Sequence, residues 1–321
     1  MDKSLELKLF EYIYGLPTDW NVISTESPDF ICIKSGSPVL GVEITELFTN
    51  ETDARLDKID GYSLALLNGG DFRHKEDKEN IKVDRVKYIK KGNDDGPEID
   101  AIIHELPNFS QRANLLIKTI IEKEGKAEKY LESCSKVDLI INDASRLFWF
   151  EKYENIFFPL SRLIDRQVII DSKFREIFLI TACKKNSIIK IPLKLNLFAE
   201  DINILEKLIV DSKSKKKIGD PKKAIILLLH CLYKSGYKNI TVKTEDGCIG
   251  LIVGSHLYLY AKNGKEIRDY STIPEQLSTG EFIDESASDL SASEKKIAFK
   301  ILKDRKNYKC CMSLFIEVGN V

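Results

Sequence analysis

The sequence offers little for covalent or metal cross-links. Its seven cysteines are odd in number and scattered over 321 residues, and no two of them stand in a C-x-x-C spacing. The four histidines are never spaced i, i+4. A disulfide framework, a zinc knuckle and a histidine metal site are therefore not supported, and any bound metal has to be held by carboxylates. This use of cysteine is typical of a reduced, cytoplasmic protein.

Long apolar runs and secretion signals are also missing. No run approaches the roughly 18 apolar residues that a membrane span needs. The first residues, MDKSLELK, lack an apolar core and a cleavage site. We therefore expect neither a secreted nor a membrane protein, and no membrane partner. The glycine loops of nucleotide-binding folds, the G-x-S-x-G serine motif and the H-E-x-x-H zinc motif do not occur either.

Charge and composition divide the chain into two parts. The formal net charge is −1, but residues 1–210 are net acidic and residues 211–321 are net basic. The segment 212–223 (SKSKKKIGDPKK) is polar, contains glycine and proline, and concentrates six lysines, which is typical of a linker. The sequence therefore predicts two domains, residues 1–212 and residues 213–321.

The spacing of apolar residues predicts a mixed α/β first domain and a smaller α+β second domain. The first domain is expected to contain a helix at 4–14, strands at 20–25, 28–34 and 38–46, a helix at 110–133, and strands at 137–141, 177–182 and 188–195. Residues 50–107 are less regular and are expected to form an insertion. In the second domain, helices at 222–234 and 292–303 are expected to accompany strands between residues 239 and 318.

Two carboxylates stand out on the predicted strand pair. Asp29 follows Pro28 at the start of one apolar strand, and Glu43 lies inside the next strand. The short turn at 35–37 makes the strands a hairpin, so the two carboxylates come within range of each other. Such a pair suits a hard cation such as Mg²⁺ or Mn²⁺, which can polarise a phosphodiester. On spacing alone, a turn carboxylate and a solvated strand carboxylate explain the pattern as well.

The spacing of these residues resembles a known nuclease motif. Pro28-Asp29, thirteen intervening residues and Glu43-x-Thr45 are similar to the motif of the PD-(D/E)xK nuclease superfamily, whose members have the restriction-endonuclease-like fold. The expected order of helix, three strands, helix and strand is similar to the core of that fold. The resemblance covers roughly residues 4–142, and it implies a restriction-endonuclease-like mixed sheet flanked by helices.

The resemblance also implies roles for particular carboxylates. In that superfamily the residues that match Asp29 and Glu43 bind Mg²⁺, and a carboxylate on the first helix often supports them. Glu6 and Glu11 are the candidates for this third carboxylate.

One departure from the motif concerns the catalytic lysine. The position two residues after Glu43 holds Thr45, which cannot supply a cation to the attacking hydroxide or to the developing charge. Some members of the superfamily carry the lysine on the following helix. Lys123 and Lys126 lie three residues apart on the helix expected at 110–133 and share a face. Lys123 is nearer to the apolar stripe and is the first candidate, although a solvated helix face explains either lysine as well.

Three further features bear on nucleic-acid binding. Gln111, near the start of the same helix, is a candidate contact to the substrate. The lysines of the linker, Lys215, Lys216 and Lys217, are candidates for phosphate contacts, although a lysine run in a polar linker is usually only solvated. The tyrosines beyond the linker are candidates for stacking on bases.

The leading hypothesis is a Mg²⁺-dependent or Mn²⁺-dependent phosphodiesterase that cuts DNA, with RNA as the second choice. The resemblance implies a role in defence against foreign DNA or in its processing. The first alternative is a catalytically inactive module of the same fold that binds nucleic acid or a protein partner, which Thr45 favours. A scaffold protein in which the motif is accidental is the second alternative. A homodimer or a protein partner bound through residues 213–321 is left open.

Overall fold

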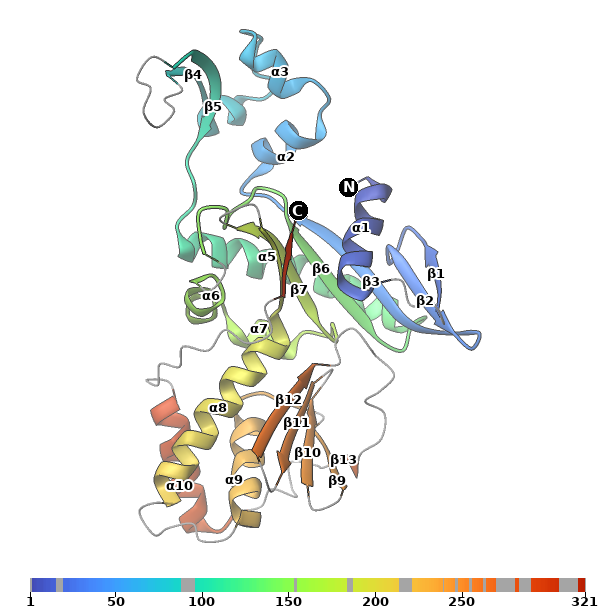
Figure 1. The fold of residues 1–321 in the computed structure, drawn as a ribbon, viewed down its shortest axis with the longest axis vertical. Helices are drawn as coiled ribbons and strands as arrows, with labels where there is room; N and C mark the ends of the chain where they lie inside the picture. The colour runs from blue at the N-terminus through green and yellow to red at the C-terminus, as the bar shows by residue number, and fades with distance from the viewer. Residues whose placement is uncertain are drawn as a thin grey trace.

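The described residues form a seven-stranded, a five-stranded and a two-stranded sheet with helices packed beside them, and Figure 1 shows the two larger sheets one above the other. The computed structural model describes residues 2–15, 20–87, 96–152, 155–183, 187–213, 221–238, 240–245, 248–253, 256–261, 264–269, 281–282, 290–305 and 317–320. The mixed α/β fold that the spacing of apolar residues predicts is confirmed. None of the helices in these ranges is long and apolar enough to cross a membrane.

The larger sheet has seven strands in the order β1-β2-β3-β6-β7-β8-β14. Its strands are β1 (Asn21–Ser24), β2 (Phe30–Lys34), β3 (Ser37–Leu47), β6 (Val137–Asp143), β7 (Ile177–Cys183), β8 (Ser187–Pro192) and β14 (Glu317–Asn320). The first three strands form an antiparallel meander, whereas β3, β6 and β7 run parallel. The remaining pairs, β7 with β8 and β8 with β14, are antiparallel.

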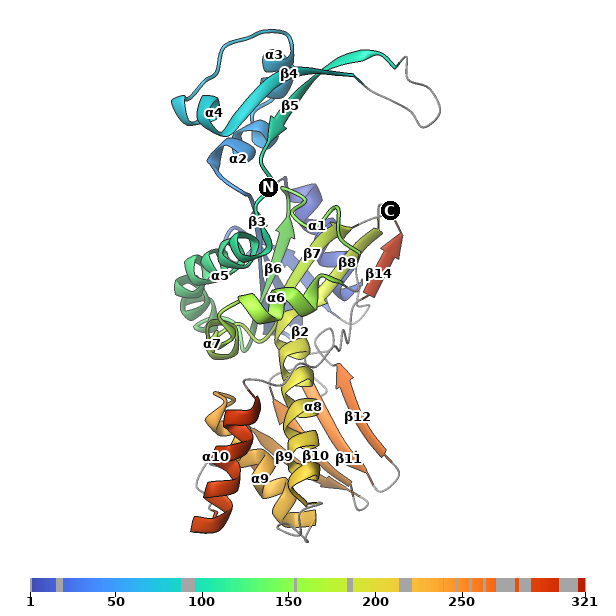
Figure 2. The ribbon, with the colours of Figure 1, turned by 90° about the vertical axis from the view of Figure 1, so that its left-hand side faces the viewer.

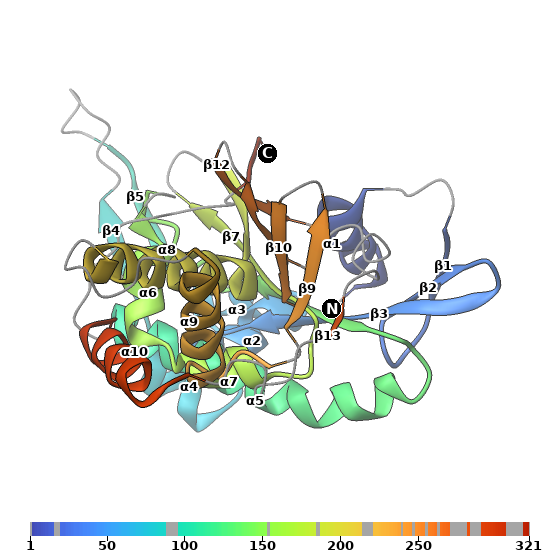
Figure 3. The same ribbon diagram turned by 90° about the horizontal axis from the view of Figure 1, so that it is seen from below.

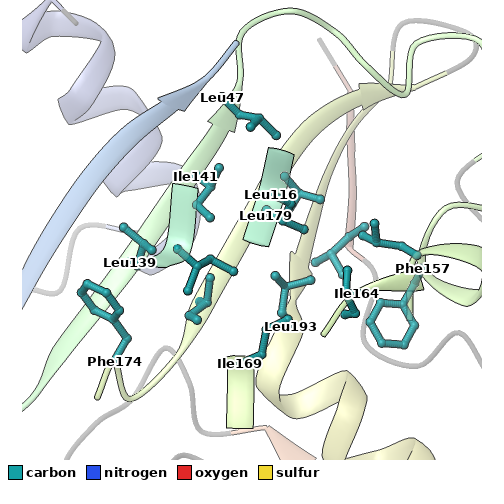
Figure 4. Close-up of a cluster of buried hydrophobic side chains, with 14 of the residues drawn as sticks. Leu47, Leu116, Leu139, Ile141, Phe157, Ile164, Ile169, Phe174, Leu179 and Leu193 are labelled. Atoms are coloured by element: carbon teal, nitrogen blue, oxygen red, sulfur yellow. The ribbon is translucent and has the colours of Figure 1, made fainter. Parts of the chain in front are cut away.

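Helices cover both faces of this sheet because its central strands carry apolar residues on both sides. The helix α1 (Lys3–Tyr14) packs on one face, where Val42 and Ile44 of β3 contribute to its apolar cluster. The helix α5 (Phe109–Leu131) lies on the other face, together with α6 (Phe157–Leu163) and α7 (Arg166–Asp171). Figure 4 shows the apolar core on this face, with Leu116 of α5 close to Leu179 of the sheet. The odd-numbered residues of β3 near its centre therefore face α5.

The segment between β3 and α5 forms a small unit with its own core, inside the range expected as an insertion. It contains α2 (Glu51–Lys58), α3 (Tyr62–Leu67), α4 (Lys75–Asn80), β4 (Ile81–Lys87) and β5 (Glu98–His104). Tyr62, Leu66 and Ile81 are buried between these elements. The Arg55 guanidinium of α2 and the Tyr62 hydroxyl of α3 both bind the buried Asp77 carboxylate of α4. These contacts hold the three helices together. Figure 2 shows this unit beyond one end of the larger sheet.

The last third of the chain builds the second core. The helices α8 (Leu193–Lys213), α9 (Pro221–Lys234) and α10 (Ala292–Arg305) pack together beside a five-stranded antiparallel sheet. The strands of that sheet, in spatial order, are β12 (Gly264–Asp269), β11 (His256–Ala261), β10 (Cys248–Val253), β9 (Thr241–Glu245) and β13 (Glu281–Phe282). In Figure 3 the three helices lie together on one side of these strands.

The packing boundary differs from the boundary at 212 and 213 that composition predicts. Leu193 and Leu197, in the first turn of α8, belong to the first core, whereas α8 from Phe198 onward belongs to the second core. In addition, β14 returns from the end of the chain to pair with β8 in the larger sheet. The lysine-rich segment marks where the chain is polar. The change of core occurs earlier, inside the helix α8, where buried apolar residues continue from Leu193 to Ile209.

Candidate active site

Glu43 is a buried carboxylate held by three donors from one helix. The ammonium groups of Lys123 and Lys126 lie 2.8 Å and 3.2 Å from its Oε1 atom. The Tyr130 hydroxyl donates a hydrogen bond of 2.8 Å to its Oε2 atom. These three residues are spaced i, i+3 and i+7 on α5, so they occupy one face of the helix. The side of α5 that faces Glu43 therefore carries two ammonium groups and the phenol of Tyr130.

Strand pairing and helix capping explain why the two groups meet. Glu43 lies in β3 opposite Leu139 of β6, and its odd position turns it toward α5. At the start of the helix, the Asn108 side chain accepts a hydrogen bond from the Gln111 backbone N–H, and the Gln111 side chain accepts one from the Asn108 N–H. This capping box satisfies two otherwise unpaired donors and fixes where the helix begins.

Asp29 is anchored beside Glu43 by the backbone of the neighbouring strand. Its Oδ2 atom accepts a hydrogen bond of 2.7 Å from the Ile44 N–H, the residue that follows Glu43 in β3. Burial raises the pKa of Asp29, and the negative charges of Glu43 and Glu6 raise it further. The hydrogen bond from Ile44 and the charge of Lys3 oppose this rise. Asp29 is thus a carboxylate in surroundings that already carry negative charge.

The pKa of Glu43 moves in the opposite direction. Burial alone raises it, but the hydrogen bonds from Lys123 and Tyr130 and the charges of both lysines lower it below its ordinary value. Glu43 is therefore ionised at neutral pH. Two neighbouring carboxylates with pKa values pushed apart are a common feature of functional sites, although ion-pair networks also produce this pattern.

Of the two helix carboxylates that the sequence offers, the structure places Glu6 near Asp29. Glu6 is buried, and the Lys3 ammonium lies 2.9 Å from its Oε2 atom and 3.5 Å from Asp29 Oδ1. Glu11 lies five residues further along α1, about 7.5 Å along the helix axis. It makes no ion pair with any residue that the structure describes. Glu6, Asp29 and Glu43 are therefore the carboxylates that this site brings together.

These residues suit a divalent cation in their chemistry, since three carboxylates are the oxygen donors that Mg²⁺ and Mn²⁺ prefer. Within the described ranges, however, no group of three or more histidine, cysteine, aspartate and glutamate side chains has an arrangement ready to hold a metal. The lysine ammonium groups instead neutralise the carboxylates. A cation can therefore be held only if it shares or displaces these contacts.

The other candidate residues have different surroundings. The Lys123 side chain is 20% exposed and that of Lys126 is 52% exposed, so Lys123 is the more enclosed of the two. Gln111 lies twelve residues before Lys123 on α5, about 18 Å along the axis. Its carbonyl oxygen is used in the helix cap. Gln111 therefore lies apart from Glu43, and its contact with a substrate stays a prediction. Residues Lys215, Lys216 and Lys217 lie outside the described residues.

Two contacts in the site were not anticipated from the sequence. Tyr130 has a recognisable signal, because it continues the helix face of Lys123 and Lys126 by one turn. Lys3 has none, because an exposed lysine near the start of a helix is common and only the fold brings it to Asp29. Thr45 lies half-buried in β3, two residues beyond Glu43, so it shares the α5 face.

Comparison with known proteins adds no assignment. No family model, no curated protein and no solved structure matches this chain. The function is therefore inferred from the geometry of the site.

Proposed function

We propose that this protein is a metal-dependent nuclease that hydrolyses phosphodiester bonds in DNA, with RNA as the second substrate to test. One observation carries the proposal. The Lys123 ammonium lies 2.8 Å from Glu43 Oε1, on the carboxylate that stands beside Asp29. A lysine from the following helix thus occupies the neighbourhood from which the motif lysine is missing at Thr45.

The strand order supports the same proposal. An antiparallel meander of β1, β2 and β3 is followed by α5 and by β6, which runs parallel to β3. The helix α1 comes before the meander and packs on the opposite face from α5. This arrangement resembles the core of the restriction-endonuclease-like fold, and we infer that the chain contains such a domain.

Each residue has a distinct part in the proposed reaction. Asp29 and Glu43 would hold the divalent cation, with Glu6 in support, and the cation would lower the pKa of a bound water and neutralise phosphate charge. Lys123 would place its positive charge where negative charge develops on the phosphate during attack. Tyr130 orients Glu43 through its hydrogen bond, and Lys126 adds a second, more exposed cation.

A second candidate function is a nuclease-like module that binds nucleic acid without cutting it. The observation that favours it is the saturation of Glu43, whose two oxygen atoms accept contacts from three donors. A carboxylate held in this way is stable without a metal. In this case Glu43 and its three donors stabilise the fold only, and nucleic-acid binding depends on basic residues outside the site.

A cleavage assay separates the two functions. Purified protein is incubated with supercoiled plasmid, linear DNA and RNA, each with Mg²⁺, Mn²⁺ or EDTA. We expect cleavage with either metal, none with EDTA, and none by Glu43→Gln or Asp29→Asn. Lys118→Ala is the matched control, because Lys118 is on the same helix but 74% exposed and paired with Glu122. If the wild type binds DNA in a salt-dependent way but cuts no substrate with any metal, the second function replaces the first.

A further inference from the structure

A pocket of about 700 Å³ is lined by none of the carboxylates and lysines of the candidate active site. It opens where the parallel strands β3, β6 and β7 end, and α1, α2 and the loop at 144–149 form its walls. Neither Asp29 nor Glu43 lines it, and no residue of α5 does. Ligands of open α/β sheets typically bind outside the carboxyl ends of the strands, and this volume is in the usual range for small-molecule sites.

The loop at 144–149 is held in place before any ligand arrives. The Asp143 carboxylate accepts a hydrogen bond of 3.0 Å from the Leu147 N–H and one of 2.6 Å from the Thr181 hydroxyl. Within this loop, the backbone of Arg146 has a φ of +53°, a left-handed conformation that is uncommon for a residue with a long side chain. Such strain persists where the surrounding contacts fix it, and it is concentrated at functional sites.

Four polar side chains that line this pocket have no polar partner among the described residues. Within the described part of the chain, Lys8, Asp57, Asn142 and Arg146 make no ion pair and no side-chain hydrogen bond. The Arg146 guanidinium lies over the ring of Trp149, 5.4 Å from its centroid. The pocket thus combines two aromatic rings, two cations, an amide and the Asp57 carboxylate with apolar walls from α1 and β7. Two further carboxylates line it, and both are already bonded: Glu46 to Lys58, and Asp143 to Leu147 and Thr181.

We propose that this pocket binds a mononucleotide. Trp149 and the apolar walls suit the faces of a base, and the Asn142 amide can donate to and accept from a base edge. Lys8 and Arg146 provide positive charge for the phosphate. The carboxylate of Asp57 can accept hydrogen bonds from ribose hydroxyls, as acidic residues do in dinucleotide-binding folds. An inorganic phosphate uses only the cations, and a plain hydrocarbon uses only the ring.

This inference goes beyond the proposed nuclease and does not depend on it. Because the pocket shares no residue with the candidate active site, Glu43→Gln should bind the nucleotide as the wild type does. Because Asp57 belongs to α2, a bound nucleotide also joins the inserted unit to the larger sheet. Loss of cleavage and loss of nucleotide binding are therefore separate results.

Fluorescence provides the first test, because the chain has two tryptophans, Trp20 and Trp149. Trp20→Phe leaves Trp149 as the single reporter. Titration of this full-length variant with AMP, GMP, CMP and UMP should give saturable quenching with at least one of them. Ribose 5-phosphate and inorganic phosphate should bind at least 10-fold more weakly. No saturable change with any mononucleotide overturns the proposal, as does equal binding of inorganic phosphate.

Calorimetry on variants locates the binding, since the removal of Arg146 alters the fluorescence itself. Arg146→Gly removes the guanidinium and relieves the left-handed strain, so it should fold. Lys8→Ala changes an exposed side chain. Each should weaken binding about 10-fold, the loss expected for one hydrogen bond to a charged group, and Lys118→Ala should not. Unchanged affinity in the Lys8→Ala/Arg146→Gly double variant overturns the site. Binding of an end-blocked single-stranded oligonucleotide without binding of any mononucleotide also overturns the proposal.

Discussion

Lys123 and Glu43 are 80 residues apart in the sequence, and their charged groups lie 2.8 Å apart. Lys123 is on a helix and Glu43 is on the strand that the helix covers, so the contact depends on the packing of α5 against β3. The pair is largely shielded from solvent, with exposed side-chain fractions of 20% and 4%. A contact of this kind stabilises the fold, and in the proposed nuclease it also places a positive charge beside the reacting phosphate. The first prediction separates them.

Lys123→Ala should lower metal-dependent cleavage about 10²–10³-fold, the scale for loss of one electrostatic stabiliser. Lys126→Ala should have a smaller effect, because its side chain is more exposed. The metal affinity of Lys123→Ala should remain, whereas Glu43→Gln should lose both cleavage and metal binding. Cleavage rates and metal titrations on the two variants measure this difference.

The control for this comparison is Lys118→Ala, which should cleave like the wild type. If Lys126→Ala is inactive and Lys123→Ala is normal, the order of the two lysines is wrong but the role of the helix stands. If both variants cleave normally, α5 does not supply the missing cation.

The sequence predicts the position of Lys123 for a physical reason. Helix periodicity places Lys123 and Lys126 on one face and at the edge of the apolar stripe, and strand periodicity places Glu43 on one side of β3. Short-range rules therefore narrow the partners of Glu43 to a few lysines. They do not identify Lys3, because its contact with Asp29 depends on how α1 crosses the sheet, which no local pattern contains.

Long-range pairing accounts for the differences in the fold as well. The strand β14 pairs with β8 across more than a hundred residues, and the short strand segment has no feature that specifies this partner. A local signal separates two helices of the inserted unit, because Gly61, with a φ of +70°, lies between α2 and α3. Composition identifies a polar segment at 212–223, but it does not show in which core the preceding helix packs.

The second prediction concerns a buried ion pair behind the site. Asp138 of β6 is fully buried, and it accepts hydrogen bonds from the Arg175 guanidinium and the Tyr14 hydroxyl. Asp138→Ala should lower the free energy of unfolding by about 3–5 kcal/mol, because it leaves the arginine charge buried and unpaired. Urea denaturation measures this loss.

A matched control is available in the inserted unit. Asp100 of β5 also pairs with an arginine, Arg85, but both side chains are exposed. Asp100→Ala should change the free energy of unfolding by no more than about 0.5 kcal/mol. Equal effects of the two variants would contradict the argument from burial.

The third prediction concerns pH. Burial raises the pKa of Asp143 to about 6, against the hydrogen bonds from Leu147 and Thr181 and the charge of Arg112. The folded protein therefore keeps this proton over a range in which the unfolded chain has lost it. Stability from this group is present at pH 4 and is lost as the pH rises to about 6, by roughly 3 kcal/mol. Asp143→Asn removes the titration.

The measurement is urea denaturation of the wild type and of Asp143→Asn between pH 4 and pH 7.5. Relative to the variant, the wild type should become less stable as the pH rises through this window. The amide cannot accept both hydrogen bonds, so the variant has a constant cost that does not depend on pH. A stability difference that stays constant over the whole range would show that Asp143 does not titrate as expected.

The last prediction tests how closely the two carboxylate-bearing strands approach each other. A Cβ atom at Gly41 would lie 3.1 Å from Pro28 Cγ and 3.2 Å from Cys134 Sγ. Gly41→Ala should therefore cost about 1–3 kcal/mol of stability through overpacking. It should also reduce cleavage, because Pro28 precedes Asp29 and Gly41 is two residues from Glu43. Cys134→Ala removes the sulfur contact, so the double variant should be more stable than the sum of the single effects predicts. Urea denaturation and cleavage rates of all three variants measure this coupling. Strict additivity would show that Gly41 and Cys134 do not press on each other and that the site tolerates a side chain there.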